Sequence, residues 1–110
     1  MERRSHARIP HMLLKDIAVT FLGNAYGSGT LHNLSTRGCK VETRSTPPPG
    51  ASLTLRLALA PETVKIDAAI VGWTIKDQYF GVKFLRVKRR GRLLLDQCIA
   101  KLAVARSSLP

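Results

Sequence analysis

Residues 53–59 read LTLRLAL, with a leucine at every second position. A period of two places alternate side chains on opposite faces of an extended strand, so one face of this stretch is apolar and the other carries Thr54, Arg56 and Ala58. Alternation over this length is typical of a half-buried β-strand and not of a helix. The stretch therefore predicts a mostly β protein.

The same alternation recurs on both sides of this stretch, between turns rich in glycine, proline and asparagine. The triproline at 47–49 ends the preceding strand, because proline donates no ladder hydrogen bond. Beyond Val64 the apolar positions are even-numbered up to Ile70 and odd-numbered from Val71, a change of phase that indicates a β-bulge. The predicted strands cover about residues 17–21, 28–34, 39–43, 53–59, 64–75 and 80–84.

Short strands at regular spacing favour a small antiparallel barrel, whose closure also removes exposed sheet edges. After Arg92, apolar residues repeat at intervals of three and four, which predicts a helix from about Arg89 to about Arg106. The expected fold is mostly β: a six-stranded antiparallel β-barrel of Greek-key or split type, with a C-terminal α-helix and a flexible N-terminal arm. The expected parts are the arm at 1–11, the barrel at 12–88 and the helix at 89–110, packed on the barrel.

The charge is the unusual feature of the composition. Eighteen Lys and Arg face seven Asp and Glu, which gives a net charge of +11 in 110 residues. Such an imbalance permits nucleic acid, an anionic membrane surface or a small phosphorylated ligand as partners. No stretch approaches the ~20 apolar residues that span a bilayer. The polar start lacks the apolar middle of a signal peptide, so a cytoplasmic protein is expected.

The sequence shows no pattern of catalytic residues. The acidic residues are not paired at a spacing suited to acid–base chemistry, and neither a nucleophile elbow nor a Walker lysine is present. The histidines and cysteines lack metal-ligand spacing, and Cys39 and Cys98 are expected to be buried free thiols of a reducing compartment. We therefore expect a binding protein with no catalytic residue, no metal and no cofactor.

Two polar motifs remain. Arg4 and Arg8 form an Arg-x-x-x-Arg motif, and residues 33–38 read Asn-Leu-Ser-Thr-Arg-Gly. Together with the later segment Gly81-Val82-Lys83-Phe84, they resemble the PilZ domain family. In that family an Arg-x-x-x-Arg motif precedes the first barrel strand and an Asp/Asn-x-Ser-x-x-Gly motif lies on an early strand turn. The resemblance covers nearly the whole chain.

The resemblance implies a receptor for cyclic di-GMP, a ring with two phosphates and two guanines. Arginine suits this ligand, because its planar fork donates two hydrogen bonds to a phosphate or a guanine edge and its flat face stacks on a base. Members of the family bind one molecule or a stacked pair, and the extra cation at Arg3 favours two ligand molecules per chain. The implied ligand-binding residues are Arg3, Arg4, Arg8, Asn33, Ser35, Arg37, Gly38 and Trp73.

Three roles stay open from the sequence. Trp73 lies beside the site or fills the core, with the core favoured. Gly38 permits a tight turn and a close approach of the backbone to the ligand. The basic stretch from Lys83 to Arg92 is either a solvated helix start or a functional patch, and arginines at a helix N-terminus oppose the macrodipole.

The expected function is a receptor or adaptor that changes conformation on binding cyclic di-GMP and signals to an unidentified protein partner. The resemblance implies motility, exopolysaccharide or virulence control. One alternative is a basic small-barrel nucleic-acid-binding protein, which is disfavoured because Phe, Trp and Tyr make up 5% of the chain. Another is a degenerate PilZ adaptor, which the intact motifs disfavour.

Overall fold

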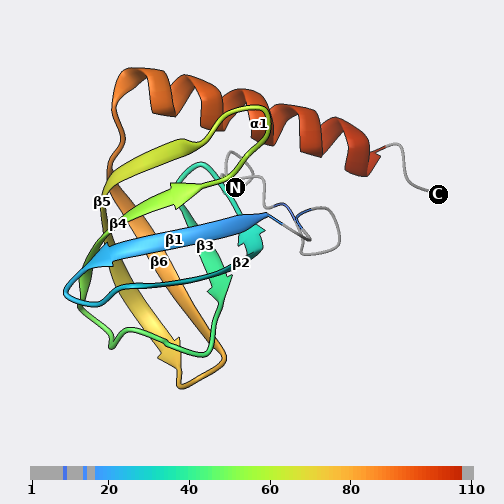
Figure 1. The fold of residues 1–110 in the computed structure, drawn as a ribbon. Helices are drawn as coiled ribbons and strands as arrows, with labels where there is room; N and C mark the ends of the chain where they lie inside the picture. Colours follow the sequence, from blue (N-terminus) through green and yellow to red (C-terminus); the bar gives the residue numbers. More distant parts are fainter. Residues whose placement is uncertain (1–8, 10–13, 15–16, 108–110) are drawn as a thin grey trace, which may run out of the picture.

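The computed structural model describes Ile9, Leu14 and residues 17–107, and every structural statement below refers to these residues. Six antiparallel strands form a closed barrel in the order β1-β2-β3-β6-β5-β4, with β4 pairing back to β1 (Figure 1). The six-stranded antiparallel barrel with a C-terminal helix is thus confirmed. The elements are β1 (Ala18–Gly23), β2 (Gly27–Leu34), β3 (Gly38–Glu42), β4 (Ser52–Leu57), β5 (Val64–Ile75), β6 (Tyr79–Arg86) and α1 (Arg89–Ser107).

The interior of the barrel is filled by alternate side chains of its strands. Leu53, Leu55 and Leu57 of β4 are 3%, 0% and 0% exposed. Phe21 of β1 meets Phe80 of β6 edge to face, with the ring centroids 5.0 Å apart. Each fully buried aliphatic or aromatic side chain contributes about 1.5–3 kcal/mol of hydrophobic stabilisation. The outer face of the barrel is therefore supported by a tightly filled interior.

Strand β5 changes phase along its length, but earlier than the sequence pattern indicated. Ala69 and Val71 are buried, whereas Ile70 is only half buried. The register with β6 shifts between Ala68 and Ala69, and again between Val71 and Trp73. A bulge leaves one residue unopposed and turns the following side chains to the other face. The second shift therefore carries Trp73 out of the interior.

The loop from β3 to β4 carries the chain across the barrel, since β3 lies between β2 and β6 whereas β4 lies between β1 and β5. The triproline at 47–49 lies in this loop and outside any strand, as predicted. The Pro47 carbonyl accepts a hydrogen bond from Thr74 Oγ1 at 2.7 Å, and Thr43 Oγ1 donates to the Ser28 carbonyl at 2.7 Å. These two bonds fasten the crossing to β5 and β2.

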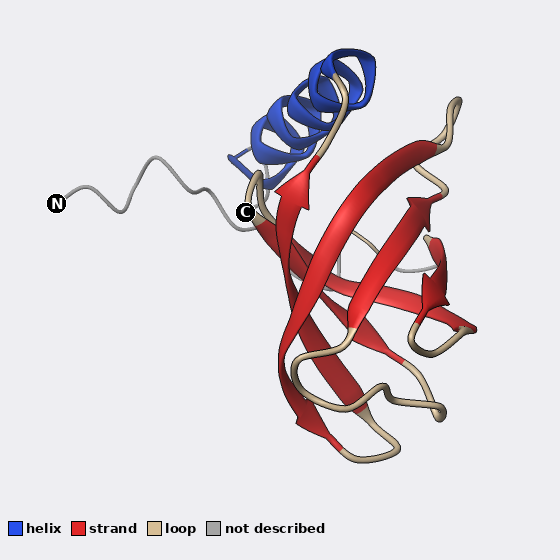
Figure 2. Ribbon diagram, turned by 90° about the vertical axis from the view of Figure 1, so that its left-hand side faces the viewer, coloured by secondary structure: helices blue, strands red, loops and turns tan. Residues whose placement is uncertain are grey.

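Helix α1 lies at one end of the barrel (Figures 1 and 2). Its Leu95 and Ile99 are 0% and 5% exposed and join the core. Gly91 lies where the helix meets β5: a Cβ at this position would be 3.2 Å from the Lys65 carbonyl oxygen, a tight contact. Within the described part of the chain, no helix is long and apolar enough to cross a membrane.

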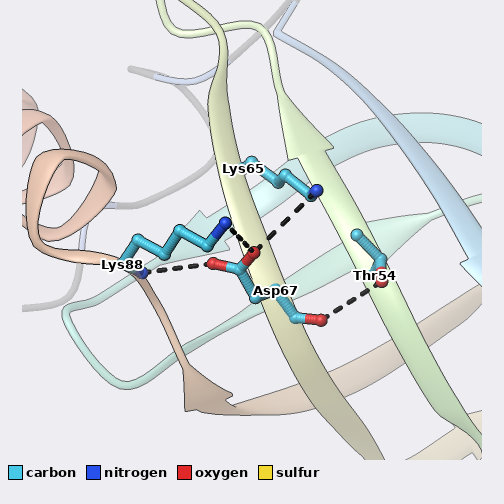
Figure 3. A network of polar contacts seen from close by, with 4 residues as sticks. All are labelled: Thr54, Lys65, Asp67 and Lys88. Carbon is cyan, nitrogen blue, oxygen red and sulfur yellow. Dashed lines mark hydrogen bonds and ion pairs between the residues drawn. The ribbon is translucent and has the colours of Figure 1, made fainter.

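A carboxylate from β5 fixes the start of α1 (Figure 3). The side chain of Asp67 is 8% exposed, and its Oδ2 accepts a hydrogen bond from the Lys88 backbone N–H at 3.1 Å. Its Oδ1 lies 3.9 Å from Lys65 Nζ and 4.0 Å from Lys88 Nζ. Glu62 accepts two hydrogen bonds from Arg90 Nη2, at 3.0 and 3.1 Å. These negative charges offset the macrodipole and the cations at the helix N-terminus.

Candidate functional site

The Asn-x-Ser-x-x-Gly motif forms the turn that joins β2 to β3. Ser35 is 5% exposed, and its backbone N–H donates to the Gly38 carbonyl at 2.9 Å. Its hydroxyl accepts a hydrogen bond from the Arg37 N–H at 3.3 Å and donates to the Gly38 carbonyl at 3.4 Å. The Arg37 carbonyl in turn accepts a bond from the Phe84 N–H of β6 at 2.7 Å. Ser35 therefore stabilises the turn from within.

Gly38 is required by the neighbouring strand and not by an unusual backbone angle. Among the described glycines, those with a positive φ are Gly23 and Gly50. A Cβ on Gly38 would collide with the carbonyl oxygen of Val82 on β6, the strand with which β3 pairs. The sequence suggested that glycine allows the backbone to approach a ligand; the close approach that the structure shows is to β6.

Four residues from four strands form a continuous row across the outer face of the barrel. Asn33 on β2 pairs with Lys40 on β3, Lys40 pairs with Gly81 on β6, and Gly81 pairs with Trp73 on β5. Paired residues on adjacent strands stand side by side on the same face. This cross-strand row brings Asn33 of the motif and the distant Trp73 to one surface.

The indole of Trp73 occupies the space above Gly81. A Cβ on Gly81 would overlap the indole atoms Nε1 and Cε2 of Trp73, and Gly81 is buried as a result. Trp73 itself is 43% exposed. The core position favoured from the sequence is therefore wrong, because the register shift between Val71 and Trp73 turns the side chain outward.

Lys40 belongs to this surface, although the sequence analysis did not single it out. Its Nζ lies 4.3 Å from the ring centroid of Tyr79 and 5.9 Å from that of Trp73. A cation over an aromatic face is attracted by about 0.5–1 kcal/mol at an exposed site. The sequence did hold a signal for Lys40 that was not used: it alternates with Cys39 and Val41, which are buried, immediately after the motif turn.

The turn and the cross-strand row line one hollow of about 260 Å³. Lys40 and Lys83 contribute cations to its lining, and none of its described lining residues is acidic. A positive hollow with one aromatic wall suits a flat anionic ligand. Five of the residues implied by the sequence line it: Asn33, Ser35, Arg37, Gly38 and Trp73.

The other three residues implied by the sequence lie outside the described residues: Arg3, Arg4 and Arg8. Within the expected arm at 1–11, Ile9 is described, and it is 0% exposed. Ile9 and Leu34 form an antiparallel bridge with backbone hydrogen bonds of 2.8 and 3.2 Å. Leu34 is the second residue of the Asn-x-Ser-x-x-Gly motif. The residue that directly follows Arg8 in the sequence is therefore anchored at the motif.

Helix α1 contacts the motif turn through Arg92. Its Nη1 donates a hydrogen bond to the Thr36 carbonyl at 2.6 Å. Four cations of the basic stretch whose role stayed open thus divide between two uses. Lys83 lines the hollow, whereas Lys88, Arg90 and Arg92 bind acceptors within the fold.

The described part of the chain has no candidate metal site and two free thiols. No cluster of three or more His, Cys, Asp or Glu side chains in this part of the chain is placed to hold a metal ion. Cys39 and Cys98 are free. Burial raises the pKa of the Cys39 thiol to about 12, so this thiol stays protonated at neutral pH. Partial burial also raises the pKa of Cys98, and nearby Lys101 opposes that shift.

Comparisons with known proteins agree with this architecture. The Bacillus subtilis inhibitor of motility (MotI/DgrA) matches with a TM-score of 0.70 and 20% sequence identity, over 96% of this chain and 54% of that one. A pathogenic protein from Xanthomonas campestris, described as a new tetrameric PilZ domain self-assembled via an unusual helical bundle, matches with a TM-score of 0.59 and 18% identity, over 77% and 53%. The chain spans about half the length of these two structures, and at such identities the likeness shows a shared fold. No curated protein sequence matches the chain at a significant level.

A protein-family model adds what the structural likeness alone does not show. The model of the PilZ domain matches residues 2–101, a range that contains both motifs, the barrel and most of α1. The PilZ family comprises cyclic di-GMP receptors and binding adaptors, not enzymes. With a match over nearly its whole length, the chain belongs to the PilZ domain family.

Proposed function

We propose that this chain is a receptor for cyclic di-GMP and that the ligand binds in the hollow between the motif turn and Trp73. The observation that carries the proposal is the convergence of residues that lie far apart in the sequence. The hollow gathers five residues implied by the sequence, and Ile9 is anchored at Leu34 beside it. Arg8 directly precedes Ile9, and Arg4 is the other arginine of the Arg-x-x-x-Arg motif. The proposal therefore assigns both arginines to the same ligand.

The chemistry of the hollow fits the two parts of this ligand. Arg37, Lys40 and Lys83 supply positive charge for the phosphates, and the arginines of the first motif add bidentate donors. The exposed indole of Trp73 offers a face on which a guanine stacks, a contact that contributes about 1–3 kcal/mol per base. The amide of Asn33 has the donor and acceptor that a guanine edge requires.

The proposal includes two ligand molecules per chain, stacked on each other. Three arginines precede the barrel, and a stacked pair carries four phosphates that need cations. A second molecule gains a guanine face to stack on once the first is bound. A calorimetric stoichiometry near one ligand per chain contradicts this part of the proposal and leaves the receptor function intact.

The output of the proposed receptor is a conformational change that a partner protein reads. In this proposal, ligand contacts to Arg4 and Arg8 change the conformation of the chain next to the motif turn, and the changed surface binds the partner. A cytoplasmic location belongs to this proposal, as expected from the sequence. Control of motility is one candidate output, because a structural neighbour is an inhibitor of motility.

Titration calorimetry with cyclic di-GMP on the native chain and on Arg8→Ala tests the proposal. Each charge-assisted hydrogen bond contributes about 1.5–3 kcal/mol, so Arg8→Ala is expected to weaken binding by about tenfold to a hundredfold. Lys76→Ala serves as the matched control, because Lys76 is an exposed cation in the turn between β5 and β6 and does not line the hollow. Absence of heat with the native chain overturns the proposal.

A parallel titration with single-stranded DNA at two salt concentrations tests the nucleic-acid alternative. Binding to DNA that weakens steeply with salt, without any binding of cyclic di-GMP, favours that alternative. Absence of binding to either ligand, by a folded chain, favours an adaptor that has lost its ligand.

A further inference from the structure

A second surface lies on the wall of the barrel opposite the hollow. The hollow is lined from β2, β3, β6 and β5, whereas a groove of about 640 Å³ runs along β1 and β4. In the closed order β1-β2-β3-β6-β5-β4, β1 stands opposite β6 and β4 stands opposite β3. We call this surface the β1–β4 groove; its lining includes Thr20, Leu22, Tyr26, Ser28, Arg56 and Lys65.

A polar row crosses the β1–β4 groove. Ser28 pairs with Thr20, Thr20 with Arg56, and Arg56 with Lys65, so hydroxyls and cations of four strands are neighbours on one face. Within the described chain Arg56 has no ion pair, and Lys65 lies 3.9 Å from Asp67 at the edge of the groove. None of the described residues that line the groove is acidic. The groove is therefore a positive surface whose central cation lacks a counter-charge.

An apolar end adjoins this polar row. Leu22 is 66% exposed and Tyr26 is 79% exposed, and both line the groove. Isolated exposed apolar residues are common, but here an aliphatic and an aromatic side chain flank two cations. Tyrosine and arginine are the residue types enriched at the energetic centres of protein interfaces, where an apolar anchor accompanies desolvated charge.

We propose that the β1–β4 groove binds an acidic, extended segment of a partner protein. Carboxylates of the segment pair with Arg56 and Lys65, its backbone bonds to the hydroxyls of Thr20 and Ser28, and one apolar side chain packs between Leu22 and Tyr26. Charge complementarity argues against a second copy of this chain, since each copy carries +11. A nucleic acid requires a longer track of cations with several stacking aromatics. The described lining holds two cations and two aromatic residues, of which Phe21 is 3% exposed, so that Tyr26 alone is available for stacking.

The position of the groove makes this inference independent of the proposed function. Because the groove and the hollow lie on opposite walls, an acidic segment and cyclic di-GMP occupy the chain at the same time. Substitutions in the groove are therefore expected to leave ligand affinity unchanged within about twofold.

Nuclear magnetic resonance titration with a panel of eight-residue peptides tests the inference. Each peptide carries four Asp or Glu residues and one Leu, Phe or Trp; a control panel replaces the acids by Asn and Gln. The expected result is a shift of the backbone signals of Thr20, Leu22, Ser28 and Arg56 by at least one acidic peptide and by none of the control panel. Arg56→Glu is expected to weaken that binding at least about tenfold, because it places a like charge against the carboxylates.

Lys76→Glu is the matched control, because it removes the same net charge from an exposed turn outside both surfaces. A loss of binding that is equal in Lys76→Glu and Arg56→Glu reports net charge alone and overturns the inference. So does the absence of binding by every acidic peptide, or signal shifts confined to other faces. A deoxythymidine decamer that binds more tightly than any peptide and depends on Arg56 assigns the groove to nucleic acid instead.

Discussion

Trp73 and Gly81 form an interlocked pair, because the indole fills the volume in which any side chain at position 81 would lie. Gly81 faces Lys40 on its other side, and Lys40 approaches the same indole. A ligand that stacks on Trp73 therefore depends on a residue that it does not touch. The glycine is needed here for space above the sheet and not for a backbone conformation.

Gly81→Ala is accordingly expected to weaken binding of cyclic di-GMP about as much as Trp73→Ala does, by about fivefold to a hundredfold. Gly72→Ala is the control for an added methyl group in the hollow: Gly72 also lines the hollow, but a Cβ there would lie 3.9 Å from the Gly81 carbonyl oxygen, an ordinary contact that does not displace the indole. Trp73 is the single tryptophan of the chain, so the emission spectrum of Gly81→Ala reports directly whether the indole has moved. Unchanged affinity in Gly81→Ala, with a shifted emission spectrum, contradicts a stacking role for the indole.

At the level of single residues, the sequence predicted the motif positions well and the surrounding residues less well. Asn33, Ser35 and Gly38 were recognised from their spacing and do line the hollow. The orientation of Trp73 depends on a bulge. One unopposed residue turns the following side chain to the other face of the sheet, and the amino-acid composition of the strand does not reveal this. Lys40 lies outside the motif, and its position beside two rings depends on pairings across three strands.

The start of α1 depends on β5, because the helix has no acidic residue in its own first turn. Asp67 accepts the Lys88 N–H and lies near two ammonium groups. A nearly buried carboxylate at a helix N-terminus thus replaces the usual capping residue. The helix is therefore fixed to β5 at its first turn, on the N-terminal side of Leu95 and Ile99, the side chains that join the core.

Asp67→Ala is expected to lower the free energy of unfolding by about 1–2 kcal/mol, since it removes a capping acceptor and one of the two carboxylates that lie beside the helix N-terminus. Asp96→Ala is the control: Asp96 lies 3.9 Å from Arg92 in an exposed i,i+4 pair on the same helix. Its loss is expected to cost about 0.5 kcal/mol or less. Urea denaturation of both variants measures the difference. Equal stabilities would show that α1 docks through its apolar face alone.

At the level of elements, prediction was most successful where a side-chain period was strong. The leucines of β4 and the stripe of α1 predicted a strand and a helix that the structure contains. The phase change in β5 was predicted but placed too late, because Ala68 and Ala69 are both apolar and do not reveal which of them faces inward. The anchoring of Ile9 was not predicted, since an isolated bridge has no period of its own.

The whole molecule carries a charge of +11, and its proposed ligand, cyclic di-GMP, is an anion. Long-range attraction accelerates association and is screened over about 10 Å at 0.1 M salt. The association rate of cyclic di-GMP is therefore expected to fall about threefold to tenfold between 0.05 and 0.5 M sodium chloride, with a nearly constant dissociation rate. Stopped-flow quenching of Trp73 fluorescence measures both rates. A salt effect confined to the dissociation rate contradicts long-range steering.

Closure of the barrel separates the two proposed binding surfaces. A six-stranded ring has no free edge, so a partner cannot add a strand and must bind on an outer face. The hollow uses the wall around β3 and β6, and the proposed partner groove uses the wall around β1 and β4.

The hydrogen bond between Arg92 and Thr36 also affects when, during its synthesis, the chain can form the proposed ligand site. The two residues are 56 positions apart, so the motif turn leaves the ribosome long before the arginine that binds its carbonyl. Strand β6, against which Gly38 packs, also follows the motif turn in the sequence and is therefore made after it. Synthesis proceeds at about 5–20 residues per second, so several seconds separate the turn from its partners. A nascent chain that still lacks β6 and Arg92 is therefore expected not to bind the proposed ligand.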